Sequence, residues 1–263
     1  MILDKIVEDK KIRIAQAKKD ISFDRQRSLA EKRVAEDTLS GAKETFYEAL
    51  IKPGLSIIGE FKKASPSLGN IKKTMELDKR IAEYTGSVEA ISCLTEEDHF
   101  SGSIEYFETI RGMTNLPMLR KDFMVDEYQF YEAKAMGANA VLLIAAILEK
   151  EQMKAFYQLT RELGMDALIE THNEEEVYKA LYCEGRIIGV NNRDLRDFSI
   201  KLDTTKNLRK AVPKDKCFVT ESGITDDESI KYLKECGVDA CLIGRAFMET
   251  DSPAQLAKRW KEI

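Results

Sequence analysis

Histidine is scarce in this sequence of 263 residues, which contains only His99 and His172. Neither belongs to a set of Cys, His and carboxylate residues at the spacing of a metal site, so we expect no bound metal and place both histidines in loops. Proton transfer at a catalytic site would then fall to Lys and Glu side chains, whose pKa values shift when they are confined beside other charges.

Paired cysteines, long apolar runs and excess positive charge are also lacking. The five cysteines form no CxxC pair, and we expect reduced structural thiols at Cys93, Cys183, Cys217, Cys236 and Cys241. Apolar runs such as residues 140–146 are too short to span a bilayer, and residues 1–20 mix charged with apolar residues, unlike a signal peptide. We therefore expect a cytoplasmic protein without membrane contact. The net charge of −5 argues against nucleic-acid binding but permits a local pocket for phosphate.

Eight short apolar runs are present, with starts spaced by about 20 to 30 residues and amphipathic stretches between them. They cover residues 55–59, 88–94, 116–119, 140–145, 166–169, 187–190, 217–220 and 240–243. Eight is the strand number of a (β/α)8 TIM barrel, an α/β fold in which chains of about this length form one domain. We therefore expect residues 1–263 to form a single barrel domain, with an open doubly wound sheet as the alternative.

The stretches between these runs contain residues that typically begin and end helices. Residues 77–85, 103–111, 127–136 and 149–163 are each followed by glycine, which is common just after a helix. Capping pairs are predicted at Asp126 with Gln129, at Asn173 with Glu176 and at Thr225 with Glu228. Residues 1–50 precede the first strand and carry an apolar stripe at helical spacing, so we expect a helical N-terminal extension packed on the barrel.

Polar residues follow most of the apolar runs, where a barrel places its catalytic groups. They are Glu60, Lys62, Lys121, Glu170, Asn191, Glu221, Ser222 and, after Gly244, Arg245. Because side chains alternate along a strand, Glu60 and Lys62 should both point to the barrel axis, and Phe61 should point outward. Any one of these residues could simply end a strand at the solvent, but together they predict a catalytic mouth.

Glycine after the last two runs predicts a phosphate site. The segments Glu221-Ser-Gly-Ile224 and Ile243-Gly-Arg245 stand where barrels commonly bind phosphate through backbone N–H groups, and Ser65 in the first loop is a further candidate ligand. Each Gly also suits a tight turn, so only the barrel context favours phosphate.

Several specific motifs occur together along the chain: Glu60-Phe-Lys-Lys-Ala-Ser-Pro-Ser67, Leu94-Thr95, Phe100-Ser-Gly-Ser103, Leu119-Arg-Lys-Asp-Phe123, Asp126-Glu-Tyr-Gln129, Ala167-Leu-Ile-Glu170, Gly189-Val-Asn-Asn-Arg-Asp-Leu195 and Glu221-Ser-Gly-Ile224. Through them the chain has a resemblance, over most of its length, to the indole-3-glycerol phosphate synthase family. It implies a cofactor-free lyase of tryptophan biosynthesis, which converts 1-(2-carboxyphenylamino)-1-deoxyribulose 5-phosphate to indole-3-glycerol phosphate by ring closure, decarboxylation and dehydration.

The resemblance also implies roles for the catalytic residues. Lys121 protonates the ketone oxygen during ring closure, and Glu60 stabilises positive charge on the anilino nitrogen. Glu170 or Lys62 serves as the acid of the dehydration, and that choice stays open. Asn191 hydrogen-bonds the substrate hydroxyls.

Further residues are implied to bind the substrate. Phe100 and Phe123 wall the aromatic ring, Arg193 supports the site electrostatically, and Glu221 lines it. The phosphate is bound by Ser65, Ser222, Gly223, Gly244 and the N–H of Arg245. Arg245 departs from the family pattern, in which a small residue usually follows this Gly. The N-terminal extension covers the mouth, and a monomer with transient contacts to other enzymes of the pathway is one open arrangement.

Other functions compete with this interpretation. A phosphoribosylanthranilate isomerase is also a barrel that binds a phosphorylated substrate, but it relies on a Cys and Asp pair for catalysis. A Schiff-base aldolase would use Lys121 as a nucleophile of depressed pKa. A catalytically silent barrel acting as a scaffold is the alternative from another class.

Overall fold

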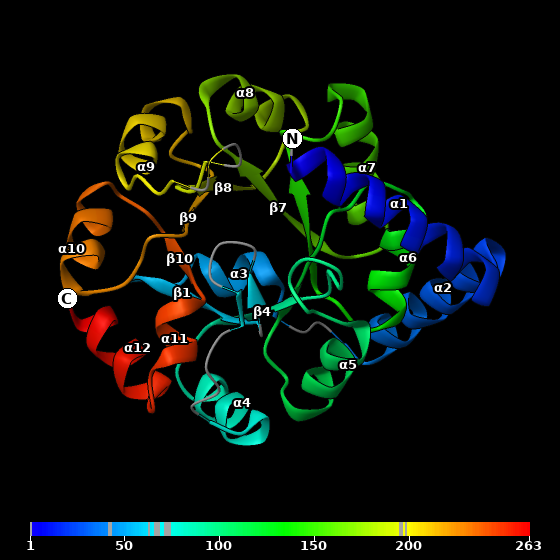
Figure 1. The fold of residues 1–263 in the computed structure, drawn as a ribbon, viewed down its shortest axis with the longest axis horizontal. Helices are drawn as coiled ribbons and strands as arrows, with labels where there is room; N and C mark the ends of the chain where they lie inside the picture. The colour runs from blue at the N-terminus through cyan, green and yellow to red at the C-terminus, as the bar shows by residue number, and fades with distance from the viewer. Residues whose placement is uncertain are drawn as a thin grey trace.

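The structure, a computed structural model, describes residues 2–41, 44–62, 64–65, 69–70, 75–194, 197 and 199–263; for residues 64–65 and 69–70 it describes only the backbone. Parallel strands close into a barrel in the order β1-β10-β9-β8-β7-β6-β5-β4 (Figure 1). These strands are β1 (Ser56–Phe61), β4 (Ala90–Leu94), β5 (Met118–Lys121), β6 (Ala140–Ile144), β7 (Asp166–Thr171), β8 (Ile187–Asn191), β9 (Cys217–Glu221) and β10 (Ala240–Ile243). Pairing of β1 with both β10 and β4 closes the ring, so the open-sheet alternative is wrong and the predicted barrel is confirmed.

Helices follow the strands and surround the barrel (Figure 1). They are α4 (Leu77–Thr85), α5 (Ile104–Met113), α6 (Tyr128–Ala135), α7 (Lys150–Glu162), α8 (Glu174–Tyr182), α9 (Asp203–Leu208) with the 3-10 turn η1 (Arg209–Ala211), α10 (Asp227–Glu235), α11 (Arg245–Glu249) and α12 (Pro253–Glu262). A short antiparallel hairpin, β2 (Ala64–Ser65) with β3 (Gly69–Asn70), follows β1. No helix of the described residues is long and apolar enough to cross a membrane.

Alternation along the strands divides the apolar residues into two cores. One set faces the barrel axis, for example Ile58, Leu119 and Leu168, and the other packs between the strands and the helices, for example Ile57 and Ile169. Every second residue of a strand therefore points into the barrel, as a barrel interior requires.

The predicted N-terminal helical extension is present as α1 (Ile2–Asp20), α2 (Phe23–Leu39) and α3 (Phe46–Leu50). Helix α2 packs along α6 on the outside of the barrel. Helix α3 lies at the amino ends of the strands, where the carboxylate of Asp166, the first residue of β7, accepts a hydrogen bond from the backbone N–H of Tyr47. Phe46 and Leu50 insert into the apolar centre of the barrel and close its lower end.

Two local predictions need correction. Several strands extend one or two residues beyond the predicted ends, because polar residues such as Glu60 and Glu221 stay paired with neighbouring strands after the apolar run stops. The cap of α10 is Asp226 with Ser229, rather than Thr225 with Glu228. Asn173 does cap α8, by accepting a hydrogen bond from the N–H of Glu176.

We predict that Phe46→Ala destabilises the fold, because it leaves a hole where α3 closes the barrel. The side chain is fully buried, so the free energy of unfolding should fall by about 3–5 kcal/mol. Urea denaturation followed by circular dichroism measures this. Tyr178→Ala, at an aromatic residue that is 59% exposed on α8, is the control and should change stability by less than about 0.5 kcal/mol. Equal effects of the two changes would contradict this account of α3.

Candidate active site

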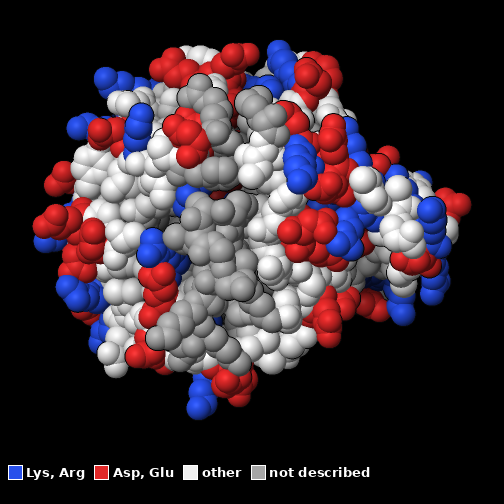
Figure 2. All heavy atoms as spheres, viewed as in Figure 1, with Lys and Arg blue, Asp and Glu red and all other residues white. Residues whose placement is uncertain are grey.

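A cavity of about 270 Å³ lies at the carboxyl ends of the barrel strands. With one exception, every residue predicted for the site lines it: Glu60, Lys62, Phe100, Lys121, Phe123, Glu170, Asn191, Arg193, Glu221, Ser222, Gly223, Gly244 and Arg245. The exception is Ser65, whose side chain lies outside the described part of the structure. Figure 2 shows both acidic and basic side chains around the edge of the molecule.

Lys121, the last residue of β5, lies between two buried carboxylates. Its Nζ is 3.1 Å from Oε2 of Glu170 on β7 and 3.0 Å from Oε2 of Glu221 on β9. Gly189 of β8 makes room for this arrangement, since a Cβ there would lie 2.7 Å from Oε1 of Glu221. That oxygen is buried and has no hydrogen-bond partner among the described residues.

Burial and charge shift the pKa values of this cluster in opposite directions. Burial would lower the pKa of Lys121, but the carboxylates of Glu221, Glu170 and Glu60 raise it above its usual range. Burial would raise the pKa of Glu170, but Lys121 and His172 lower it below its usual range. For Glu221, burial together with the negative charge of Glu170 outweighs Lys121 and raises the pKa to about 7. At neutral pH the site thus holds a Lys121 ammonium, an ionised Glu170 and a Glu221 that can hold or release a proton.

Glu60 and Lys62 form a second charged pair across the cavity from this cluster. Their side chains point the same way and meet, with Oε1 of Glu60 2.6 Å from Nζ of Lys62, while Phe61 packs in the outer core beside Tyr106. The predicted alternation is therefore confirmed. Gly244 leaves space for the pair, because a Cβ at that position would lie 2.4 Å from Oε1 of Glu60 and 2.7 Å from Nζ of Lys62.

The end of β8 is fixed by a residue that the sequence analysis missed. Asn192 is buried; its Nδ2 donates to the carbonyl oxygens of Glu221 and Ser222 at 3.0 and 3.1 Å, and its Oδ1 accepts from Thr205. Asn192 therefore holds the loop after β9 against β8. Its neighbour Asn191 lines the cavity and accepts a hydrogen bond from the N–H of Arg193.

The loops after β9 and β10 form the end of the cavity that was predicted to bind phosphate. Ser222 and Gly223 both have positive φ angles, 66° and 82°. A positive φ angle is uncommon for a non-glycine residue such as Ser222. It persists where function or tight packing requires it. The side chain of Arg245 is half-exposed and binds Glu249 one turn along α11. Arg245 is nevertheless among the residues that line the cavity.

An aromatic wall stands beside Lys121. The rings of Phe100 and Phe123 lie 6.1 Å apart, centroid to centroid, and both line the cavity. The loop that carries Phe100 is held by the buried carboxylate of Glu96, which accepts hydrogen bonds from the N–H groups of His99 and Phe100.

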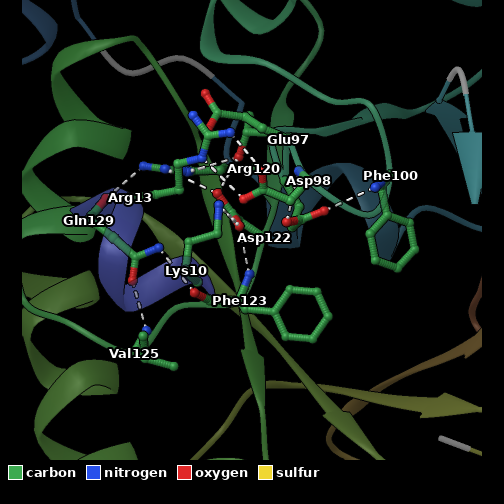
Figure 3. Close-up of polar contacts among 12 residues, drawn as sticks. Lys10, Arg13, Glu97, Asp98, Phe100, Arg120, Asp122, Phe123, Val125 and Gln129 are labelled. Carbon is green, nitrogen blue, oxygen red and sulfur yellow. Dashed lines mark hydrogen bonds and ion pairs between the residues drawn. The ribbon is translucent and has the colours of Figure 1, made fainter. Parts of the chain in front are cut away.

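Helix α1 of the extension is tied directly to this part of the mouth (Figure 3). Nζ of Lys10 reaches Oδ1 of Asp122 at 2.8 Å in a buried ion pair, and Arg13 pairs with Asp98 on the loop after β4. Asp122 also accepts hydrogen bonds from the N–H of Phe123 and from Arg120. Since Asp122 lies between Lys121 and Phe123 in the sequence, the extension helps to hold the site. No local sequence pattern around Lys10 signals this contact.

Comparison with known proteins agrees with this geometry. The family model of indole-3-glycerol phosphate synthase matches residues 3–260. The chain is 51% identical to the indole-3-glycerol phosphate synthase of Lachnospira eligens, over 100% of this chain and 98% of that protein. It is 48% identical to that of Clostridium acetobutylicum, over 94% of this chain and 92% of the relative.

Solved structures show the same fold at much lower identity. The 3-hexulose-6-phosphate synthase of Salmonella typhimurium aligns with a TM-score of 0.65 at 12% identity, over 79% of this chain and 97% of that one. A thiamine phosphate pyrophosphorylase from Pyrococcus furiosus aligns with a TM-score of 0.57 at 16% identity, over 79% and 94% of the two chains. These matches bear on the fold alone.

We predict that Glu221→Gln alters the pH dependence of stability. The pKa of Glu221 is raised in the folded state to about 7, from an ordinary value near 4.5, so its protonated form favours folding and that contribution is lost as pH rises through this window. The stability of the unmutated chain, relative to Glu221→Gln, should therefore fall between about pH 5 and pH 8, by roughly 1–3 kcal/mol. Denaturant unfolding at the two pH values measures the difference.

Glu108→Gln is the matched control, because Glu108 is exposed on α5. Its stability difference from the unmutated chain should be the same at both pH values. If Glu221→Gln behaves like this control, Glu221 is ionised throughout the range and the raised pKa is wrong.

Proposed function

Because the chain belongs to the indole-3-glycerol phosphate synthase family, it is a decarboxylating lyase of tryptophan biosynthesis, and we propose which of its residues carry out the reaction. Its substrate is 1-(2-carboxyphenylamino)-1-deoxyribulose 5-phosphate, and ring closure, loss of CO₂ and loss of water yield indole-3-glycerol phosphate. The observation that carries the assignment is the buried Lys121 between Glu170 and Glu221, facing the Glu60–Lys62 pair across one cavity.

Lys121 is the acid of ring closure in this proposal. The ring carbon that bears the carboxylate attacks the ketone carbon, and the ketone oxygen takes a proton from the Lys121 ammonium and becomes a hydroxyl. The attack leaves positive charge on the anilino nitrogen, which the carboxylate of Glu60 stabilises more strongly in the transition state than in the ground state. The raised pKa of Lys121 supports the role, because it keeps the proton in place until an alkoxide develops.

Decarboxylation follows without an added acid or base. The bond from the ring to the carboxylate breaks, CO₂ leaves, and the electron pair neutralises the nitrogen cation and restores the aromatic ring. Lys62 is placed to pair with the substrate carboxylate before it leaves, in exchange for its contact with Glu60.

Dehydration needs both an acid and a base, and we assign Lys62 and Glu170 to these two roles. The hydroxyl made in the first step leaves as water with a proton from Lys62, and the carbon next to it loses a proton to Glu170. The lowered pKa of Glu170 supports this division, because the free enzyme then holds it as a carboxylate that accepts a proton rather than as an acid. The proton balance agrees: two protons are given and one is taken, as decarboxylation of a carboxylate requires.

The remaining residues position the substrate. Phe100 and Phe123 wall the aromatic ring, and Asn191 with Glu221 binds hydroxyl groups, while Arg193 adds positive charge nearby. The phosphate is held by Ser65, Ser222, Gly223, Gly244 and the backbone N–H of Arg245. The positive φ angles at residues 222–223 support this choice, because a tight turn at the cavity can present backbone N–H groups to an anion.

The competing enzyme functions are less well supported. None of the five cysteines lines the cavity, so the Cys and Asp pair of an isomerase is not assembled there. A Schiff-base lysine needs a depressed pKa, whereas that of Lys121 is raised.

We further propose that residues 1–263 act as one domain, and that α1 of the extension formed by residues 1–50 helps to retain substrate. The buried Lys10–Asp122 pair supports this, since it joins the extension to the barrel mouth. All the residues in the scheme belong to one chain, which supports a monomer as the working unit. The five free thiols support a reducing compartment such as the cytoplasm.

We predict that Lys121→Met abolishes turnover, because the developing alkoxide loses its proton donor. Indole fluorescence after addition of the anilino-ribulose phosphate should appear at least about a hundredfold more slowly. Lys231→Met, at an exposed lysine of α10, is the control and should act at the normal rate. Near-normal turnover by Lys121→Met would exclude Lys121 as the acid.

We predict that Glu170→Gln separates the two later steps in time. In a single turnover with substrate labelled in its carboxyl group, CO₂ should be released at close to the normal rate, while indole fluorescence lags by about tenfold or more. Lys121→Met should delay both signals together. A Glu170→Gln variant that delays CO₂ release as much as indole formation would contradict the assignment of Glu170 to the dehydration.

A further inference from the structure

We propose that His172 is a positioning residue, which holds the Glu170 carboxylate ionised and aimed at the substrate while Lys121 is without its proton. The inference rests on the proposed role of Glu170. His172 lies in the predicted loop position, directly after β7. Its sequence context predicts no part in the chemistry.

Glu170 is held at both of its oxygens by different cations. Oε2 lies 3.1 Å from Nζ of Lys121, and Oε1 lies 3.4 Å from Nε2 of His172. This Nε2 is buried and has no hydrogen-bond partner among the described residues, and the Glu170 carboxylate is the charged group that it faces. The imidazole and the ammonium thus stand on opposite sides of one carboxylate.

His172 is itself fixed from behind by Glu176, on the first turn of α8. One carboxylate oxygen of Glu176 accepts from the backbone N–H of His172 at 2.7 Å and lies 3.0 Å from Nδ1 of the ring. The other accepts from the side chain of Asn173 at 2.7 Å. With both oxygens of Glu176 engaged, the ring cannot rotate freely, and its Nε2 stays directed at Glu170.

The surroundings of His172 keep it charged. Burial would lower the pKa of His172, but Glu170 and Glu176 outweigh that effect and raise it to about 10. Other charged groups line the hollow beside the ring, namely Arg193, Asp194 and Lys201. An imidazolium is therefore present throughout the neutral range, and Glu176 supports its charge from the side away from Lys121.

A second cation beside Glu170 matters because Lys121 gives up its proton in the first step of the reaction. Ring closure removes the proton of Lys121, and the neutral amine then no longer stabilises the negative charge of Glu170. At that stage a buried Glu170 with no other cation would take up a proton more readily and could not accept one during dehydration. His172 transfers no proton in this scheme. Its charge keeps Glu170 ready for the step that follows.

The test compares His172→Gln, which keeps a donor near Glu170 but removes the charge, with His99→Gln as the matched control. His99 is the other histidine of the mouth, and it binds Asp9 of the extension. In single turnovers of the full chain with carboxyl-labelled substrate, His172→Gln should release CO₂ within about twofold of the normal rate, while indole formation slows by about tenfold at pH 6 and recovers toward pH 8. The acidic limb of the profile for indole formation should move up by about one pH unit. His99→Gln should show no such separation.

A second variant tests the proposal even if His172→Gln fails to fold. Glu176→Gln keeps the histidine but removes one of the charges that raise its pKa, so it should give the same separation to a smaller degree. Equal slowing of CO₂ release and indole formation by His172→Gln, with an unchanged pH profile, would overturn the proposal in favour of a purely structural role. If Glu170→Gln separates the two signals and His172→Gln does not, only the role of His172 fails. If Glu170→Gln does not separate them, both assignments fail.

Discussion

The alternation of side chains around a closed parallel barrel is the constraint on which the rest of this molecule depends. Every second residue of each strand points to the axis, and all strands end at the same mouth. Apolar residues fill the lower layers, and α3 closes the base. Charged residues at the strand ends are therefore forced together in a space that excludes most water, and each needs an opposite charge nearby.

The balance of charge in that space determines the chemistry available to it. Three carboxylates, Glu60, Glu170 and Glu221, face two ammonium groups from Lys62 and Lys121. The carboxylates outnumber the ammonium groups by one, and the cations are shared unequally among the carboxylates. Glu170 is kept ionised by cations on both sides, whereas Glu221 shares one cation and titrates near neutrality. Residues of the same type thus acquire different acid and base properties from position alone.

Parts of the chain far from the strand ends hold this arrangement in place. Asn192 joins the ends of β8 and β9, Glu96 shapes the loop that carries Phe100, and Lys10 reaches from the first helix to Asp122. A buried ion pair such as Lys10–Asp122 is weak evidence for added stability, because desolvation offsets much of its attraction, but breaking it leaves an unpaired buried charge. Such a contact fixes geometry, and here it fixes the residue next to Lys121.

The sequence by itself determined the eight strands, the order of the elements and the inward direction of Glu60 and Lys62, because these follow from local periodicity and from short motifs. It also marked the residues that line the cavity, since barrel strands share one geometry and their ends can be read one at a time. Only the tertiary structure decided the pairings. Lys121 meets Glu221 from 100 residues away, and Lys10 meets Asp122 across 112 positions, so no local pattern records either contact. For the same reason, the sequence predicts only a loop position for His172, and the fold places its ring against Glu170. The charge and role of a buried group depend on its neighbours in space, which local sequence does not show.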